Sequence, residues 1–554
     1  LGAEEGYTIA DLWERTSARF AQRPAFAYVG CERFPEQRVT FAEMDAWVNR
    51  VANWATKAEG LVSGDVIAMF MSNRIDYVAF WLGLCKVGVK VAFINTSIKL
   101  TPLVHSIAVA KAKLLLFGVE LEAQVADVQS ELFREHGVEA VCSGGPSQIA
   151  RTVDQVVASQ ASAAPARSAR AGIKFTDVFG YVYTSGTTGL PKAVRVTHLK
   201  QWAFAAGYSD HVTEQDVVYS AGMPLYHSSA SGIGTGMVLH NGCMQVLRNK
   251  FSATHWLSDV RKYNATVCQY IGELCRYVLA QPPSAHDADN SLRLATGNGL
   301  SKEIWVEFQT RFGINTIREF FGSTEGNGAF RNDVHLANLL RGDHAGVGCI
   351  GRISPGNPRG IRFVRFDFDS NELLRDKPSG SLVDCALGEP GECLFPIRPN
   401  QATSQFVGYT DASASKKKLV RDGNMSYFRT GDLLSLDEEG WVRFVDRIGD
   451  TFRWRGENVS TFEVASELSK CPCVQEANVY GVAIPHTEGR AGMAAVVFRQ
   501  GHGGDGSTLR ELLNDVLKHA QRALPSYAVP MFLRVQPATS LTQTFKHQKV
   551  QLRE

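Results

Sequence analysis

The sequence predicts a layered α/β fold: a large N-terminal domain with several subdomains, followed by a small mobile C-terminal α+β domain. Of the 554 residues, 44% are hydrophobic, which is enough for several cores. The continuous apolar run at residues 66–71 is typical of a strand buried on both faces of a parallel sheet. The 50 glycines suit the many tight turns that connect strands and helices in such folds.

The order of elements in the first 140 residues supports this fold class. Helical periodicity and short apolar runs alternate, which is the β-α-β rhythm of a layered α/β protein. We expect helices at 9–20, 41–55 and 77–87 and strands at 38–41, 66–71 and 89–94.

Two later segments have unusual compositions. Residues 157–172 are rich in Ala, Ser and Arg, and we expect a mobile linker there. Residues 217–247 contain no Asp, Glu, Lys or Arg over a length that could cross a membrane. Because Pro224, His227 and several serines and glycines interrupt that stretch, a buried strand–loop–helix is the better interpretation, with peripheral membrane contact left open.

The pattern changes again beyond about residue 450, where short segments indicate a small α+β domain. The segments are 462–470, 477–482, 494–498 and 509–523. We therefore predict a large domain at 1–446, a hinge at 447–450 and a small C-terminal domain at 451–554.

Composition and spacing exclude several classes of function. A net charge of +2 gives no electrostatic reason to expect a nucleic acid partner. The 11 cysteines are an odd number without regular spacing, which argues against a disulfide framework. Cys471 and Cys473 form one close pair, but no second Cys or His pair has zinc-ligand spacing. No G-x-S-x-G motif supports a serine hydrolase.

The most informative segment runs from Tyr183 to Lys192 and follows a buried strand at 178–183. It contains an unbroken series of hydroxyl and glycine residues: Thr184, Ser185, Gly186, Thr187, Thr188 and Gly189. Such a loop presents backbone N–H groups and small hydroxyls to an anion, and Lys192 adds a cation. The Walker loop is excluded because Leu190, and not lysine, follows Gly189. We therefore predict a phosphate-binding loop, with a plain surface loop as the alternative.

This string resembles the phosphate-binding signature of the adenylate-forming enzymes, which include acyl-CoA synthetases, peptide-synthetase adenylation domains and luciferases. Further short motifs that form the ligand sites of that family follow in the same order, and we call them stations. The resemblance runs from about residue 8 to the end of the chain. The stations are Gly297-Asn298-Gly299, Phe321-Gly322-Ser323-Thr324-Glu325, Thr430-Gly431-Asp432, Asp446-Arg447, Gly449, Gly456 and Lys546.

The resemblance implies an ATP site. The turn Gly297-Asn298-Gly299 would let the backbone approach adenine, and Phe321 with Gly322 would lie against the base. Asp432 would accept the ribose hydroxyl groups, and Arg447 would reach the ribose or a phosphate. Without the family context, these short motifs are equally well explained as turns, a salt bridge and packed side chains.

The resemblance also implies groups that act on the acid and the phosphates. Glu325 and Thr184 would hold Mg²⁺, a hard cation that prefers oxygen ligands. Thr324 would lie at the phosphates. His227, in the segment Met223–Ser229, would lie beside the carboxylate that is activated, with a packed core histidine as the alternative.

The small domain would carry two functional faces and turn about a hinge. Lys546 aligns with the family's catalytic lysine, with Lys549 as the alternative, and Gln543 replaces a glycine common in the family. Gly456 would line the passage for the pantetheine arm of coenzyme A. Gly449 occupies the hinge station, where relatives often have Asp or Lys.

The closest branch resembles the fatty acid transport proteins and very-long-chain acyl-CoA synthetases. Long strings carry this narrower resemblance: residues 270–277, 297–300, 446–460 and 488–494. It implies ATP-dependent ligation of long- or very-long-chain fatty acids to coenzyme A through acyl-AMP, coupled to fatty acid uptake. It also implies peripheral or anchored membrane association, with the catalytic domain on the cytosolic face of the plasma membrane or endoplasmic reticulum.

Two other functions stay open at this point. One is a membrane fatty-acid carrier with a vestigial nucleotide site, and the other is a ligase for another acid such as a bile acid. The complete set of nucleotide stations weighs against the carrier. No sequence signal predicts the preferred acyl chain length, the oligomeric state or the organelle. The start at Leu1 and the early end relative to the family lead us to expect a chain shortened at both ends.

Overall fold

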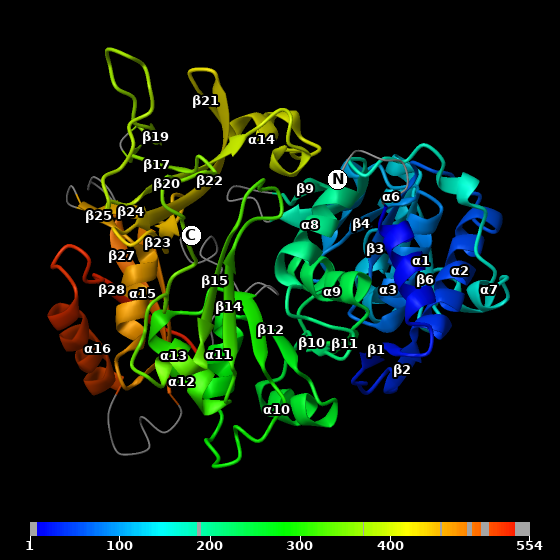
Figure 1. Ribbon diagram of the computed structural model, residues 1–554, viewed down its shortest axis with the longest axis horizontal. Helices are drawn as coiled ribbons and strands as arrows, with labels where there is room; N and C mark the ends of the chain where they lie inside the picture. The colour runs from blue at the N-terminus through cyan, green and yellow to red at the C-terminus, as the bar shows by residue number, and fades with distance from the viewer. Residues whose placement is uncertain are drawn as a thin grey trace.

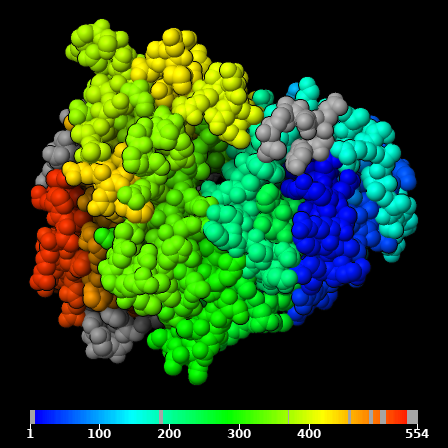
Figure 2. Space-filling model, in the orientation of Figure 1, coloured from blue at the N-terminus to red at the C-terminus, as the bar shows by residue number. Residues whose placement is uncertain are grey.

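The computed structural model describes residues 8–184, 190–368, 370–454, 457–484, 490–499 and 509–537. The fold contains three large sheets and a small C-terminal sheet, and Figure 1 colours their strands by position in the chain. The blue and cyan lobe packs broadly against the green lobe in Figure 2, so the first two sheets and their helices form one large body. The predicted α/β class is confirmed.

The first sheet has the strand order β7-β6-β5-β3-β4-β8-β9 and is parallel except for the β8–β9 hairpin. Its strands are β3 (Val66–Phe70), β4 (Lys90–Phe93), β5 (Leu114–Gly118), β6 (Glu139–Ser143), β7 (Arg151–Thr152), β8 (Val178–Thr184) and β9 (Lys192–Thr197). The helices of this part of the chain are α1 (Ile9–Arg19), α2 (Phe41–Lys57), α3 (Ile75–Lys86), α4 (Leu100–Val109), α5 (Glu122–Ala126), α6 (Gln129–His136) and α7 (Asp154–Ala158).

The second sheet has the order β15-β14-β13-β12-β10-β11-β1-β2, so the first two strands of the chain complete a sheet made mostly of later residues. Its strands are β1 (Pro24–Tyr28), β2 (Gln37–Thr40), β10 (Val217–Tyr219), β11 (Met244–Leu247), β12 (Val267–Ile271), β13 (Leu294–Asn298), β14 (Thr316–Phe321) and β15 (Phe330–His335). The accompanying helices are α8 (His198–Tyr208), α9 (Gly236–Asn241), α10 (Ala253–Lys262), α11 (Gly272–Leu279), α12 (Lys302–Arg311) and α13 (Leu336–Leu339).

The third sheet is antiparallel and lies at the upper left of Figure 1. Its strands are β16 (Gly351–Arg352), β17 (Arg362–Val364), β20 (Gly391–Ile397), β21 (Leu419–Asp422), β22 (Met425–Leu436) and β23 (Trp441–Arg447). The short pair β18 (Phe366–Asp367) and β19 (Glu372–Leu373) and the helix α14 (Ala412–Lys417) accompany it.

The small C-terminal domain follows β23. It contains the hairpin β24 (Phe452–Trp454) and β25 (Glu457–Val459), the sheet β26 (Val474–Val482), β27 (Ala491–Phe498) and β28 (Phe532–Val535), and the helices α15 (Thr461–Ser469) and α16 (Leu509–Ala523). Phe452 and Trp454 are buried in its core, which favours a packing role for these two aromatic side chains.

Helix starts follow local sequence signals. Thr8 caps α1 and Thr40 caps α2, and in each case the carboxylate three positions later accepts a hydrogen bond from the backbone N–H of the cap residue. This reciprocal capping box satisfies N–H groups that a helix start otherwise leaves unpaired. The strand β3 is buried at every position, as the continuous apolar run predicted.

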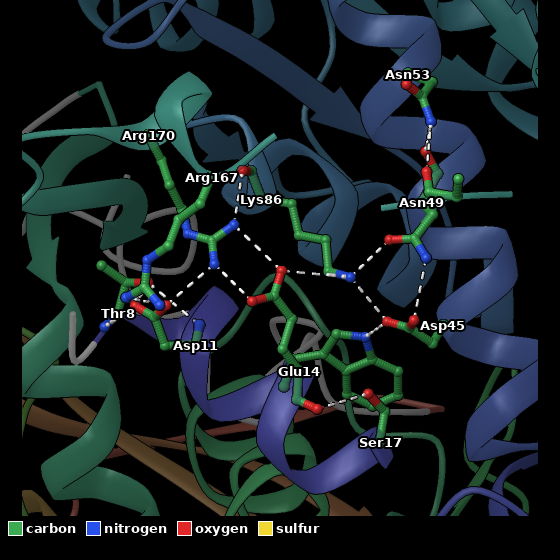
Figure 3. Close-up of polar contacts among 12 residues, drawn as sticks. Thr8, Asp11, Glu14, Ser17, Asp45, Asn49, Asn53, Lys86, Arg167 and Arg170 are labelled. Atoms are coloured by element: carbon green, nitrogen blue, oxygen red, sulfur yellow. Dashed lines mark hydrogen bonds and ion pairs between the residues drawn. The ribbon is translucent and has the colours of Figure 1, made fainter. Parts of the chain in front are cut away.

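The prediction of a mobile linker at residues 157–172 is wrong. Asn53 of α2 donates hydrogen bonds to the carbonyl oxygens of Ala161 and Ala163, at 2.9 and 3.0 Å. Arg170 is buried and pairs with Glu14 and Asp11 of α1, at 2.6 and 3.0 Å. Figure 3 shows Arg170 beside Glu14, which also approaches the buried Lys86. Polar partners on three helices therefore hold a segment whose composition is typical of a loop.

The uncharged stretch 217–247 forms β10, the seven-residue π-helix η3 (Ser229–Thr235), α9 and β11. Nearly all of it is buried, as predicted. Within the described residues, no helix combines the length and apolar character that crossing a bilayer requires.

The Arg170 contacts generate a stability prediction. Arg170→Ala removes the buried counter-charge of Asp11 and one of the two of Glu14, which keeps Lys86 at 3.6 Å. We expect it to lower the free energy of unfolding by about 2–4 kcal/mol. Arg167→Ala is the matched control, because Arg167 also pairs with Asp11 but is 65% exposed. It should cost less than about 1 kcal/mol. Urea unfolding followed by tryptophan fluorescence measures both, and equal losses would show that burial of Arg170 is not the stabilising feature.

Candidate active site

The predicted phosphate loop lies at the open end of the β8–β9 hairpin. Thr184 and Lys192 are directly opposite each other in the antiparallel register, so they bring both ends of the loop together. Tyr183 is buried and its hydroxyl donates to the carbonyl oxygen of Ser106, while His105 Nε2 lies 3.2 Å from the carbonyl oxygen of Pro191. The loop residues Ser185, Gly186, Thr187, Thr188 and Gly189 lie outside the described residues.

Backbone pairing connects this hairpin to Glu325. Residues 408–410 run alongside β9: the Arg195 N–H donates to the Gly408 carbonyl at 3.0 Å, and the Thr410 N–H donates to the Ala193 carbonyl at 2.9 Å. Tyr409, held between these two bonds, donates its hydroxyl to Glu325 Oε1 at 2.9 Å. Burial and the adjacent Glu325 carboxylate raise the pKa of Tyr409 well above its usual value. The tyrosine is therefore a neutral donor to Glu325.

The end of β14 brings the Thr324–Glu325 station to the loop that contains His227. Thr324 Oγ1 lies 3.3 Å from Ser228 Oγ, which is the residue after His227. The carbonyl oxygen of His227 accepts hydrogen bonds from the N–H and the hydroxyl of Ser231, at 3.1 and 2.8 Å. The structure thus places the predicted acid-activating segment beside the predicted phosphate and metal station.

Asn73, which the sequence did not single out, fixes the turn before His227. Its side-chain amide donates to the Met223 carbonyl at 2.8 Å, and its amide oxygen accepts from the Leu225 N–H at 2.8 Å. Asn73 is buried, so both bonds form in a low-dielectric environment where unpaired groups are costly. The first and second lobes are joined at this turn.

A chain of buried polar side chains lies beneath the π-helix. The hydroxyl of Thr235 donates to Gln245, Gln245 donates to Ser220, Ser220 donates to Gln269, and Gln269 donates to the carbonyl oxygen of Ser229, at 2.7–2.9 Å. All four hydrogen bonds of this network run in the same direction, from Thr235 at the end of the π-helix to Ser229 at its start. The network therefore sets the length and position of the segment that follows His227 and Ser228.

The turn at Gly297-Asn298-Gly299 forms at the end of β13. Gly299 has a φ of +80°, a conformation that favours glycine. The buried Glu319 of β14 accepts hydrogen bonds from the N–H groups of Gly299 and Leu300 and from the hydroxyl of Tyr270. Burial raises the pKa of Glu319 to about 8, although the three donors favour the ionised form.

Phe321 and Gly322 lie directly beyond this turn, at the end of the neighbouring strand β14. The Phe321 ring is partly buried and packs against Phe330, with ring centroids 6.0 Å apart and an interplanar angle of 41°. Gly322 is exposed.

The third sheet brings Asp432 and Arg447 together. They are opposite each other on β22 and β23, with Arg447 Nε 3.5 Å from Asp432 Oδ1. The preceding Gly431 has a φ of +79°, and its N–H donates to the fully buried Glu392 at 3.1 Å. Arg429 forms an ion pair with Glu392, with a guanidinium nitrogen 2.7 Å from Glu392 Oε2. The buried Glu392 thus positions the turn that presents Asp432.

The predicted hinge follows β23 directly, because that strand ends at Arg447 and residues 448–450 form a turn. Asp446 is buried and accepts hydrogen bonds from the N–H groups of Arg447 and Thr461, at 2.8 and 2.7 Å. Thr461 begins α15, so this carboxylate links the last strand before the turn to the small domain. Gly456 and Lys546 lie outside the described residues.

The donors around Glu325 fit magnesium rather than a transition metal. No cluster of three or more His, Cys, Asp or Glu residues suited to a metal occurs in the part of the chain that the structure describes. Mg²⁺ is commonly held by one or two carboxylates together with substrate phosphates, and Glu325 beside Thr324 offers that donor set. Cys471 and Cys473 have sulfur atoms 3.4 Å apart, but both are buried.

Comparison with known proteins identifies the family. Residues 13–383 match the model named "AMP-binding enzyme", and residues 463–546 match "AMP-binding enzyme C-terminal domain". The chain belongs to the AMP-binding enzyme family. The matched C-terminal range includes Lys546, and the first range includes every nucleotide station from Thr184 to Glu325.

Relatives and solved structures of AMP-binding enzymes agree with this assignment. The "Long-chain fatty acid transport protein 1" of Bos taurus is 41% identical over 99% of this chain and 82% of its own length. The "Medium/long-chain-fatty-acid--CoA ligase FadD6" of Mycobacterium tuberculosis is 36% identical over 99% of this chain and 85% of its own length.

Two solved structures share the fold. The anthranilate CoA ligase AuaEII in complex with anthranoyl-AMP has a TM-score of 0.80 at 20% identity, with 100% of this chain and 97% of that chain covered. A benzoate CoA ligase from Burkholderia xenovorans LB400 has a TM-score of 0.79 at 21% identity, with 99% and 100% covered. The predicted adenylate-forming fold is confirmed, whereas the roles of the individual residues stay predictions.

The environment of Glu319 predicts a dependence of stability on pH. The pKa of Glu319 rises from 4.5 to about 8 on folding, so between these pH values the folded state holds a proton that the unfolded state has lost. The resulting stabilisation is complete below pH 4.5 and is lost as the pH rises through 8. Glu319→Gln keeps acceptor and donor groups of similar shape but cannot titrate. We expect unfolding midpoints of the parent to fall relative to this variant as the pH rises from about 5 to 9.

A second variant sharpens this test. Tyr270→Phe removes one donor to the carboxylate, which should raise the pKa of Glu319 further and move the loss of stability to higher pH. Parallel pH curves for the parent and Glu319→Gln would show that this carboxyl group does not titrate in the range.

The chain of side chains beneath the π-helix predicts an effect on both stability and acid binding. Gln269→Leu removes the acceptor of the Ser220 hydroxyl and the side-chain donor to the Ser229 carbonyl, and we expect a cost of about 1–3 kcal/mol in unfolding free energy. Thr235→Val, at the other end of the chain, removes one donor only and should cost less. If the network positions His227, Gln269→Leu also raises the KM for the acid while leaving the KM for ATP within about twofold, measured by pyrophosphate release.

Proposed function

We propose that this protein joins long- or very-long-chain fatty acids to coenzyme A through an acyl-AMP intermediate. The observation that carries the proposal is the convergence on Glu325 of the β8–β9 hairpin, Thr324 and the His227 loop. The Asp432–Arg447 pair adds a ribose station. The names of the relatives, which include fatty acid transport proteins and a fatty acid–CoA ligase, support a fatty acid as the substrate class.

In the first half-reaction, a carboxylate oxygen of the fatty acid attacks the α-phosphorus of ATP, and pyrophosphate leaves with the bonding electron pair. The phosphate loop would orient the leaving phosphates, and Thr324 would donate to a phosphate oxygen. Glu325, with Thr184, would hold Mg²⁺, which would neutralise phosphate charge. Catalysis would rest on positioned cations and N–H donors, as in other phosphate displacements.

In the second half-reaction, the thiol of coenzyme A attacks the acyl carbonyl and AMP leaves. We propose that the small domain turns about residues 447–450 between the two halves, presenting Lys546 first and the Gly456 side second. The link from Asp446 to Thr461 supports a hinge here, because it is a contact that such a motion would alter. Conversion to the coenzyme A ester would trap the acyl chain and so couple ligation to uptake.

Membrane association belongs to the same proposal and rests on the names of the transport-protein relatives. A carrier with a vestigial nucleotide site is the competing function, and a bile acid ligase is another. The purified chain with ATP, Mg²⁺ and a panel of octanoate, palmitate, lignocerate, cholate and benzoate separates them by pyrophosphate release. Release with palmitate or lignocerate supports the ligase, release with cholate alone supports the bile acid alternative, and none with any acid supports the carrier.

The metal role of Glu325 has its own test. Glu325→Gln removes one charged ligand while keeping an oxygen that Tyr409 can reach. We expect the magnesium concentration for half-maximal pyrophosphate release to rise about tenfold or more, because ligand charge sets affinity for hard cations. Glu307→Gln, an exposed position on α12, should match the parent. A magnesium titration identical to that of the parent would remove Glu325 from the metal site.

The domain rotation predicts that Lys546 serves one half-reaction only. Lys546→Ala should abolish acyl-AMP formation from ATP and acid, yet leave the conversion of supplied acyl-AMP to acyl-CoA within a few-fold of the parent. Lys549→Ala is the control and should retain both halves. Single-turnover assays of each half decide the matter: if Lys549→Ala shows the selective loss instead, the catalytic lysine is Lys549, and equal loss of both halves argues against rotation.

A further inference from the structure

Lys418 lies between two stations of the nucleotide site that are far apart in the sequence. It follows α14 and precedes β21, and its side chain is 27% exposed. Its ammonium group donates to the carbonyl oxygen of Thr430 at 3.0 Å and lies 3.9 Å from Glu325 Oε1. It also lies 3.5 Å from the position that a Cβ atom on Gly431 would occupy. One cation therefore contacts both the turn before Asp432 and the carboxylate of Glu325.

Two cationic side chains act on the Glu325 carboxylate. Lys418 lies 3.9 Å from it, and Lys200, from α8, interacts with it electrostatically, although burial lowers the pKa of Lys200 to about 8. The only hydrogen bond to Glu325 among the described side chains comes from the neutral hydroxyl of Tyr409. Asp432, on the other side, has the guanidinium of Arg447 as its own counter-charge. A surplus cation next to a predicted phosphate station favours an anionic ligand.

We propose that Lys418 binds the α-phosphate of the nucleotide and of the acyl-adenylate. The inference rests on the proposed function, in which Asp432 takes the ribose and Glu325 the metal that accompanies the outer phosphates. In ATP the α-phosphate connects the ribose to the outer phosphates. Lys418 has the matching place in the protein, because it contacts the turn before Asp432 on one side and Glu325 on the other. An ammonium group has three donors, so it can keep its bond to Thr430 while it exchanges Glu325 for a phosphate oxygen.

This position gives Lys418 a role different from that of Lys546. When the carboxylate oxygen bonds to the α-phosphorus and the bond to pyrophosphate breaks, negative charge stays on the non-bridging oxygens of the α-phosphate. Lys418 stabilises that charge by donating a hydrogen bond, and no proton leaves it. Because Lys418 belongs to the large domain, it also remains beside the phosphate of AMP during the second half-reaction, whichever face the small domain presents.

AMP and adenosine provide the test, because they differ only by the α-phosphate. Isothermal titration calorimetry without acid or magnesium measures both ligands on the parent, Lys418→Met, Lys418→Arg and Lys417→Met. We expect Lys418→Met to weaken AMP about tenfold to a hundredfold, as for loss of a charge-assisted hydrogen bond, with adenosine changed less than about twofold. Lys418→Arg should retain part of the AMP affinity, and Lys417→Met, at an exposed neighbouring position, should equal the parent.

Three outcomes contradict the inference in different ways. Unchanged AMP affinity in Lys418→Met shows that the ammonium group does not contact the phosphate. Equal weakening of AMP and adenosine shows that Lys418 only supports the turn at Thr430, and a lowered melting temperature would accompany it. If the parent binds neither ligand, the proposed function fails as well, which distinguishes that failure from one confined to Lys418.

Discussion

The hydrogen bond from Tyr409 to Glu325 is the constraint on which the site depends, because it joins all three large sheets. Tyr409 is held by backbone pairing of residues 408–410 to β9 of the first sheet, while Glu325 follows β14 of the second. Lys418 then connects Glu325 to the turn of the third sheet that presents Asp432. Each station alone is a short turn at a strand end. These side chains, together with the pairing of residues 408–410 to β9, hold the stations in their relative positions.

The residues that hold the stations are buried polar groups that point away from the solvent. Asn73, Gln269, Glu319 and Glu392 each bind backbone or side-chain groups of a turn, and each is buried. A buried polar group is costly unless its partners are in place, so each one penalises any other conformation of its turn. This is how loops that must bind ligands with little local regularity are kept in one geometry.

The sequence predicted the fold class and, in the first 140 residues, the helices α1, α2 and α3 and the strands β2, β3 and β4, since these signals are local. The roles of the site motifs stay predictions. The mobile linker at 157–172 was wrong because composition does not reveal distant partners such as Asn53 and Glu14. The supporting residues were missed for the same reason. A usable signal did exist: Gln245, Gln269, Glu319 and Glu392 each interrupt an otherwise largely apolar strand. Polar residues in buried strands must have partners. Lys418, in a run of three lysines, carried no such signal.

The bond between Asp446 and Thr461 adds a physical condition to any rotation of the small domain. Asp446 precedes the predicted hinge and Thr461 follows it, so turning about residues 447–450 must break or reshape this bond. The carboxylate lies at the first turn of α15, where the helix dipole and free N–H groups favour a negative charge. Separating the two takes the Thr461 N–H away from a buried carboxylate. A second arrangement of comparable stability must therefore supply Asp446 with a donor in place of Thr461 or expose it to water, and the balance between these two environments would set how readily the proposed rotation exchanges the Lys546 and Gly456 faces.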